Sequence, residues 1–344
     1  MKELLRKLSN SYGISGYEDE IRNIIKEELE NYVHEIRIDT LGNIIAIKEG
    51  SDTSVMLSAH MDEIGLMVKS IDKNGFIRFT KFGGWYDAVL LNSRVVLHTG
   101  KGKVYGVIGS KPPHLMKDEE KKKAIKAEEM FIDIGAKNKE EVEKAGISIG
   151  TPITLDVEMK ELINDIVTGK ALDNRVGIVM MIEAIKNTKS NATIYAVGTV
   201  QEEVGLKGAR TSAYGLSPDI AIVCEVAVAG DHPGIKEEES IVKLGNGPVI
   251  TVADASGRGI ITQHRILKWL KETAEKEGIN YQLEVSEGGT TDAAVIHITK
   301  AGIPCGVVSV PTRYMHSGVE LISLRDLEES VRLIAKALEN LNNI

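Results

Sequence analysis

The sequence predicts an α/β protein, with a mixed sheet sandwiched by helices and a small β-barrel domain inserted into it. Apolar strand-like runs alternate with helix-like segments early in the chain and again after about residue 160. Between these blocks lie many short strand-like pieces separated by glycine turns, a pattern typical of a small barrel or sandwich. We therefore expect one domain from residues 1–67 and 160–344, and an inserted β-rich domain from residues 68–159.

The first block is predicted to open with two helices. The second of these spans about Tyr17 to Asn31 and carries apolar residues at helical spacing. Strands are expected at Ile36–Asp39 and Ile44–Lys48, joined by a hairpin turn. The run Val55–Ala59 is almost wholly apolar, as in a strand buried at the centre of a sheet.

The remaining elements follow the same reasoning. In the inserted block, strands are expected at Val95–Leu97 and Val104–Tyr105, and the charged stretch Lys117–Glu129 is expected to be a solvated helix or loop. The later block is predicted to contain strands at Ala192–Val200, Asp219–Cys224 and Pro304–Val310, and helices at Asn174–Asn187, Ile260–Lys276 and Leu324–Leu341.

Composition narrows the function classes. The chain has 344 residues, with 42 Lys plus Arg against 50 Asp plus Glu and a formal net charge of −8. This acidic balance argues against a broad surface for nucleic acid or anionic membranes. No apolar run approaches the ~20 residues of a membrane span. Cys224 and Cys305 are expected to be reduced thiols, and the N-terminus lacks the apolar stretch of a secretion signal, so we expect a cytoplasmic protein.

Several predicted strands are followed by side chains that can bind metal ions. These are His60 after Val55–Ala59, Glu202 and Glu203 after Ala192–Val200, Glu225 after Asp219–Cys224, and His316 after Pro304–Val310. A fifth segment places Asp173 just before a predicted helix. Because functional groups in open α/β sheets gather beyond the carboxyl ends of the strands, we expect these side chains to converge.

Two imidazoles and several carboxylates suit Zn²⁺, Co²⁺ or Mn²⁺. One carboxylate can bridge two ions ~3.5–4 Å apart, as in two-metal hydrolysis, and Asp173 is the natural bridge. In the pair Glu202-Glu203, one side chain can bind metal while the other accepts a proton from water. Taken singly, each residue also has an ordinary structural interpretation: Asp173 as a helix N-cap, for example, or the glutamate pair as a solvated surface.

Six ordered motifs resemble the TET-type (tetrahedral) di-metal aminopeptidases, a family that includes glutamyl and deblocking aminopeptidases and some members labelled endoglucanases. The resemblance covers nearly the whole chain. The motifs are Gly13-Ile14-Ser15-Gly16-Tyr17-Glu18, Ala59-His60-Met61-Asp62-Glu63-Ile64-Gly65, Ala171-Leu172-Asp173-Asn174-Arg175-Val176-Gly177, Gln201-Glu202-Glu203-Val204-Gly205, Gly288-Gly289-Thr290-Thr291-Asp292 and Pro311-Thr312-Arg313-Tyr314-Met315-His316-Ser317.

This resemblance implies a zinc-peptidase-like fold and a set of residue roles. His60, Asp173 and Glu225 would hold one divalent ion, and Asp173, Glu203 and His316 a second, with Zn²⁺ or Co²⁺ expected. Glu202 would be the general base, and Asp62 would orient the His60 imidazole from behind. The inserted domain would mediate dimerisation, and six dimers would close into a tetrahedral dodecamer.

The expected activity is removal of N-terminal residues from short peptides. Glu225 departs from the family pattern, which commonly has Asp at this position, and it motivates the alternative of a related di-metal carboxypeptidase or deacylase. An endoglucanase is less favoured, because glycosidases typically use two carboxylates without metal. A non-catalytic peptide-binding shell protein would be expected to lack a ligand or the base, and none is missing.

Overall fold

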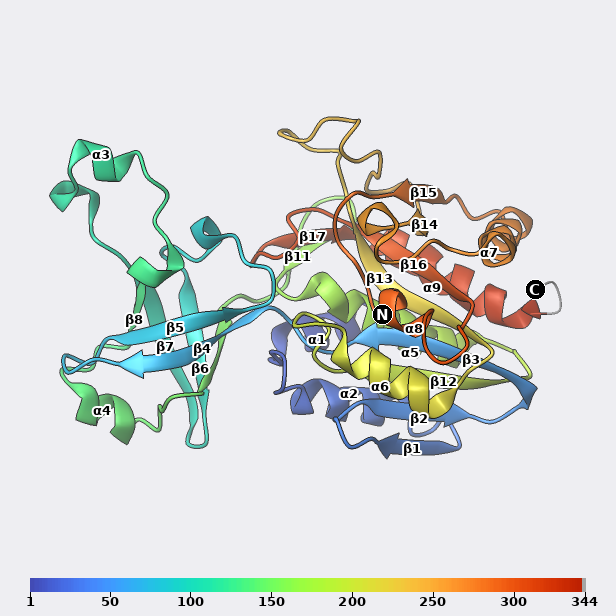
Figure 1. Cartoon of the computed structure of the whole chain (residues 1–344), viewed down its shortest axis with the longest axis horizontal. Coiled ribbons are helices and arrows are strands. Elements are labelled where there is room, and N and C mark those ends of the chain that lie inside the picture. Colours follow the sequence, from blue (N-terminus) through green and yellow to red (C-terminus); the bar gives the residue numbers. More distant parts are fainter. Residues whose placement is uncertain (342–344) are drawn as a thin grey trace.

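The computed structural model describes residues 1–341, apart from the side chain of residue 52. It has two parts: a large sheet covered by helices, and a separate barrel at the left of Figure 1. The large sheet has the strand order β1-β2-β12-β3-β13-β16-β14-β15. In chain order these strands are β1 (Glu35–Ile38), β2 (Ile44–Lys48), β3 (Ser51–His60), β12 (Ala192–Thr199), β13 (Ile220–Val228), β14 (Val249–Ala253), β15 (Gln282–Val285) and β16 (Cys305–Thr312).

Helices cover both faces of this sheet. The side chains of strand β3 point alternately to the two faces. Val55 and Leu57 belong to the larger core cluster on one face, and Met56 belongs to the smaller cluster on the other. The larger cluster is covered by α1 (Lys2–Asn10), α2 (Asp19–Leu29), α5 (Leu172–Asn187), α7 (His264–Glu277) and α9 (Leu324–Glu339), and the smaller one by α6 (Lys207–Leu216) and α8 (Ala293–Ile296). The predicted mixed sheet between helices is confirmed.

The central strands β3, β12, β13 and β16 run parallel, so their carboxyl ends lie at one edge. In this register Thr199 at the end of β12 is paired with His60 at the end of β3. Glu225 was expected just after its strand, and this was wrong, since β13 continues to Val228 and Glu225 lies within it opposite Ser309. The strand continues because its neighbour β16 pairs with it through Thr312.

The inserted segment forms a closed six-stranded barrel, as predicted. Its strands are β4 (Gly65–Ile71), β5 (Ile77–Phe82), β6 (Arg94–Thr99), β7 (Gly102–Gly109), β8 (Phe131–Asp133) and β9 (Pro152–Leu155). The barrel has a hydrophobic core of its own, built from residues such as Leu66, Leu97 and Ile153. The charged stretch after Lys117 contains only the short α3 (Asp118–Lys121) and a 3₁₀ turn, and α4 (Lys139–Lys144) follows β8.

A small three-stranded sheet, which the sequence analysis did not anticipate, lies beside the junction of the two parts. It contains β10 (Lys160–Glu161), β11 (Ile166–Gly169) and β17 (Glu320–Ser323) in that order.

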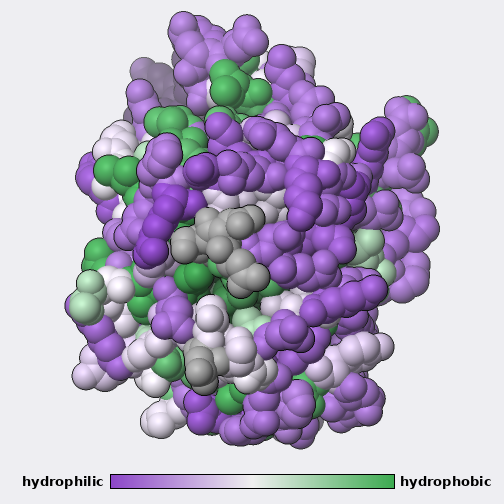
Figure 2. Space-filling view, turned by 90° about the vertical axis from the view of Figure 1, so that its right-hand side faces the viewer, coloured by the Kyte–Doolittle hydropathy of each residue, from purple (hydrophilic) through white to green (hydrophobic). Residues whose placement is uncertain are grey.

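The end of the molecule opposite the barrel is mainly hydrophilic, with hydrophobic residues in separate small patches (Figure 2). Within residues 1–341, every helix is too short or too polar to cross a lipid bilayer.

Candidate metal centre and active site

The structure brings all six residues proposed for ligation and catalysis to one place. His60 ends β3, Glu202 and Glu203 follow β12, Glu225 lies near the end of β13, His316 follows β16, and Asp173 lies in the first turn of α5. All six line a single cavity of about 1100 Å³ at the carboxyl edge of the sheet. The expected convergence therefore exists, and it follows from the parallel strands that share this edge.

Asp173 lies between the two histidines. Its Oδ1 is 3.1 Å from Nε2 of His60, and its Oδ2 is 3.4 Å from Nε2 of His316. Glu225 Oε1 is 3.8 Å from the His60 nitrogen, and Glu203 Oε1 is 3.5 Å from the His316 nitrogen. Two compact donor groups thus share one carboxylate, and within each group the donor atoms lie within 4.8 Å of one another.

The backbone at Asp173 favours this placement over a helix cap. The N-cap of α5 is Ala171, and the backbone angles of Asp173 and Asn174 are not helical. The Asp173 side chain is therefore free to face the histidines, while its own N–H donates to Oε2 of Glu320 at 2.9 Å.

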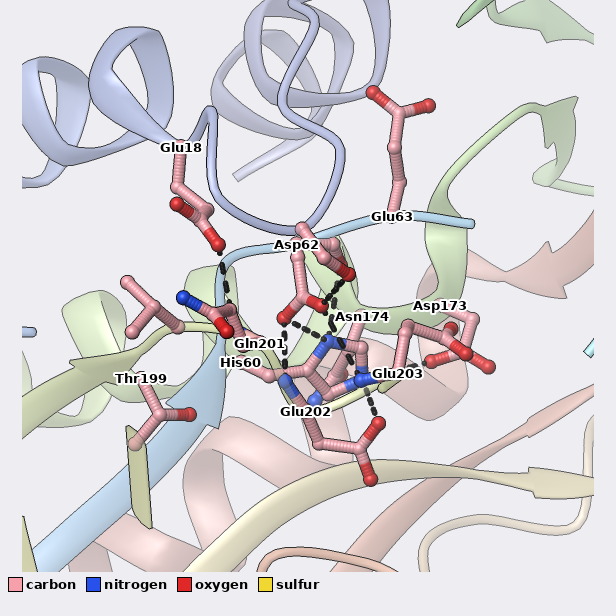
Figure 3. A network of polar contacts seen from close by, with 12 residues as sticks. Glu18, His60, Asp62, Glu63, Asp173, Asn174, Thr199, Gln201, Glu202 and Glu203 are labelled. Atoms are coloured by element: carbon pink, nitrogen blue, oxygen red, sulfur yellow. Dashed lines mark hydrogen bonds and ion pairs between the residues drawn. The ribbon is translucent and has the colours of Figure 1, made fainter. Parts of the chain in front are cut away.

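Asp62, which the family resemblance proposes as the residue that orients His60, lies behind this imidazole (Figure 3). Nδ1 of His60 is 3.0 Å from the Asp62 backbone carbonyl and 3.6 Å from its carboxylate, so Nε2 points toward Asp173. The Asp62 carboxylate in turn accepts hydrogen bonds from the Ser15 hydroxyl at 2.6 Å and from the N–H groups of Glu202 and Glu203 at 3.0 and 3.2 Å. Asp62 thereby links the strand end that carries His60 to the turn that carries the glutamate pair.

The barrel also contributes to the site. Nδ1 of His316 lies 2.7 Å from the carbonyl oxygen of Gly84, in the loop after β5, and this contact directs Nε2 toward Asp173 and Glu203. A Cβ at Gly84 would lie only 2.9 Å from that nitrogen. A side chain at position 84 would therefore displace the imidazole.

The electrostatics of the cluster suit cations. Burial, together with the charge of Asp173, raises the pKa of Glu203 to about 7. Burial likewise raises the pKa of Glu225 well above its ordinary value. Burial alone would lower the pKa of His316, but the Asp173 and Glu203 carboxylates raise it to about 9. Several buried carboxylates that repel one another form a donor set that divalent cations would neutralise, so the residues fit a metal centre.

Glu320 is a site residue that the sequence analysis missed. It is 1% exposed, and its two carboxylate oxygens accept the N–H groups of His316 and Asp173, both at 2.9 Å. One buried side chain therefore fixes the backbone of two candidate ligands. The sequence held a signal for it, since a lone acid flanked by Val319, Leu321 and Ile322 is costly to bury without partners.

Asp292 is a second such residue, quoted only as part of a motif. It is 1% exposed, and one oxygen accepts the hydroxyls of Ser58 at 3.0 Å and Thr199 at 2.6 Å. Burial is the main cause that raises the pKa of Glu202 well above its ordinary value, and the Asp292 charge adds to it. The charge of Asp292 therefore increases the proton affinity of the Glu202 carboxylate.

The helix-covered sheet and the paired donor groups fit a metal-dependent hydrolase of the α/β class. The chain matches the M42 glutamyl aminopeptidase family over residues 42–333, and it therefore belongs to that family. It is an aminopeptidase-type hydrolase, and the carboxypeptidase or deacylase alternative is not favoured.

Individual relatives match along almost the whole chain. The TET aminopeptidase of the marine sediment archaeon Thaumarchaeota archaeon SCGC AB-539-E09 has a TM-score of 0.95 and 41% identity, over 99% of this chain and 96% of its own. The TET1 peptidase of Pyrococcus horikoshii has a TM-score of 0.89 and 36% identity, over 99% of each chain. The lysyl aminopeptidase of Pyrococcus furiosus is 37% identical over 98% of this chain and 97% of its own.

Proposed function

We propose that this protein is a metal-dependent aminopeptidase that removes N-terminal residues from short peptides. The observation that carries the proposal is the placement of Asp173 between His60 and His316, with one carboxylate oxygen facing each imidazole. Family membership supports the aminopeptidase class.

The proposed ligands form two sets. His60, Asp173 and Glu225 would hold one divalent ion, and Asp173, Glu203 and His316 the other. When bound, the ions would act as Lewis acids on the peptide carbonyl and lower the pKa of water. Zn²⁺ or Co²⁺ suits this mixture of imidazole and carboxylate donors. Glu225 in place of the shorter Asp is accommodated, because its Oε1 reaches within 3.8 Å of Nε2 of His60.

Glu202 is proposed as the general base. Its side chain lines the cavity, and Oε2 is 3.9 Å from Nε2 of His60. The raised pKa of this carboxyl suits a group that accepts a proton from the attacking water and returns it to the leaving amine. Asp62 holds Glu202 in place through the backbone N–H at 3.0 Å.

The test is a panel of aminoacyl-anilides, assayed after chelation and after re-addition of Zn²⁺, Co²⁺ or Mn²⁺. We expect activity to be lost and then restored, and to require a free amine. A second comparison pairs a peptide that has a free amine with its N-acetylated counterpart, which keeps the free carboxylate. Cleavage of the acetylated peptide alone would instead identify a carboxypeptidase or deacylase. Metal binding without any turnover would identify a peptide-binding shell protein.

We also propose that the inserted domain, residues 68–159, mediates dimerisation and that six dimers form a tetrahedral dodecamer. The support is the similarity to a TET1 peptidase that can assemble into a tetrahedron or a large octahedral shell. The solution mass tests the assembly. We place the enzyme in the cytoplasm, which suits two buried, unpaired thiols, Cys224 and Cys305.

Similarity does not decide which N-terminal side chain is preferred. The family is named for glutamyl activity, whereas one relative at 37% identity is a lysyl aminopeptidase. These two side chains carry opposite charges, so the preference of this chain must come from its own cavity.

A further inference from the structure

The cavity that contains the candidate metal centre continues toward strands β14 and β15. This extension carries acidic side chains that are not proposed as metal ligands. They are Glu238, Glu239, Asp254, Glu284 and Glu287. Within residues 1–341, no lysine or arginine lines the cavity. A substrate group that enters the extension therefore meets several acids and no lysine or arginine among the lining residues.

Asp254 is the most buried of these acids. It is 4% exposed, and its Oδ1 accepts the N–H of Ile260 at 2.5 Å. Its Oδ2 is buried and has no hydrogen-bond partner among the described residues. Asp254 lines the cavity, and a buried carboxylate that lacks one of its hydrogen-bond donors favours a ligand that can supply one.

Glu284 lies on β15, in register with Thr251 on the adjacent β14, and both line the same cavity. Burial raises the pKa of Glu284 to about 7, and the charge of Asp254 is the second cause. The two acids are therefore near enough to repel each other. A cation placed between them would relieve this repulsion and favour the ionised form of both.

The wall of the cavity also offers apolar surface to a substrate side chain. Apolar atoms come from residues such as Leu206, Val226 and Ala227. A lysine or arginine side chain can bury its methylene stem against such a wall while its charged head reaches an acid. A glutamate side chain is shorter, would meet like charge and would bring no hydrogen-bond donor to Asp254.

We propose that Asp254 and Glu284 form the base of a specificity pocket for a cationic N-terminal residue, lysine or arginine. The pocket is the extension of the active-site cavity, so this inference rests on the proposed aminopeptidase function. The preference comes from two acids outside the metal centre, and it can be removed without altering any proposed ligand.

The test compares Lys-, Arg-, Leu- and Glu-anilides with the metal-loaded protein and with Glu284→Gln and Asp254→Asn. We expect kcat/KM for the Lys substrate to exceed that for Leu about 10- to 100-fold, with Glu lowest, because charge-assisted hydrogen bonds in a desolvated pocket discriminate on this scale. In each variant kcat/KM for the Lys and Arg substrates should fall toward that for Leu, because one acid of the pocket has lost its charge. The control is Glu272→Gln, an exposed residue on α7 outside the cavity.

An equal loss of kcat/KM on all substrates in the variants would overturn the proposed pocket specificity. A preference of the wild type for the Glu or Leu substrate would overturn it as well. If no anilide is cleaved, the proposed function fails, and binding still tests the pocket through thermal shifts with free L-lysine and L-leucine. A shift with lysine that is lost in Glu284→Gln would support it, and equal shifts with both amino acids would refute it. If Glu284→Gln does not fold, the same measurements on Asp254→Asn test the proposal.

Discussion

Replacing Glu284 by glutamine should stabilise the folded protein at alkaline pH, although it should remove the preference for basic residues. The pKa of this carboxyl is raised from 4.5 to about 7 in the folded state, mainly by burial. Glutamine has nearly the same shape but carries no charge. The substitution therefore removes the cost of keeping a buried carboxylate ionised.

The magnitude follows from linkage. A carboxyl that titrates near 7 when folded and near 4.5 when unfolded costs the folded state about 3 kcal/mol above both values, since each pKa unit corresponds to about 1.4 kcal/mol. The folded state binds this proton more tightly, so stability is lost as the pH rises from about 4.5 through about 7. At about pH 5 the cost falls below about 1 kcal/mol. For 344 residues, 3 kcal/mol corresponds to about 4 °C in Tm.

The assay is thermal unfolding of the wild type and Glu284→Gln at about pH 5 and about pH 8.5, with the metal content held equal. We expect the variant to melt about 4 °C higher at the alkaline pH and nearly together with the wild type at the acid pH. Glu272→Gln on the exposed surface of α7 should show no such dependence. An equal Tm difference at both pH values, or a loss of stability at about pH 8.5, would refute the reasoning.

Three further predictions concern the metal centre. Glu202→Gln should keep its metal content while turnover falls about 10²- to 10⁴-fold, and near-normal activity would contradict its role as the base. His316→Ala should lower the bound metal measured by elemental analysis, and full occupancy would argue against ligation. Glu320→Gln should weaken metal binding about 10- to 100-fold in a Zn²⁺ titration, because an amide offers only one acceptor oxygen where Asp173 and His316 each need one. Unchanged affinity would show that the two N–H contacts do not position the ligands.

Much of the fold could be predicted because its patterns are local. The strand Ile44–Lys48 has the predicted bounds, since a short apolar run between turns allows few alternatives. Helix α6 was missed because its buried face consists of small residues, Gly208, Ala209, Ser212 and Ala213, which give a weak periodic signal. The pairing of β11 with β17 was missed because it joins segments about 150 residues apart.

Some residues of the candidate site could likewise be predicted from the sequence, and others could not. The carboxyl ends of apolar strands are visible in the sequence, so the candidate ligands could be found before their distances were known. Glu320 could not be found in this way, because its role depends on backbone N–H groups from two other elements. The contact of Gly84 with His316 was equally hidden, since it joins the barrel to the sheet.

The sequence by itself determined the class of fold and the residues that could bind metal, because apolar periodicity and residue chemistry are properties of short segments. Only the tertiary structure decided that Asp173 faces both histidines and that Asp254 and Glu284 share the cavity with them. The physical reason is that burial and the repulsion between carboxylates depend on which distant segments the fold brings together.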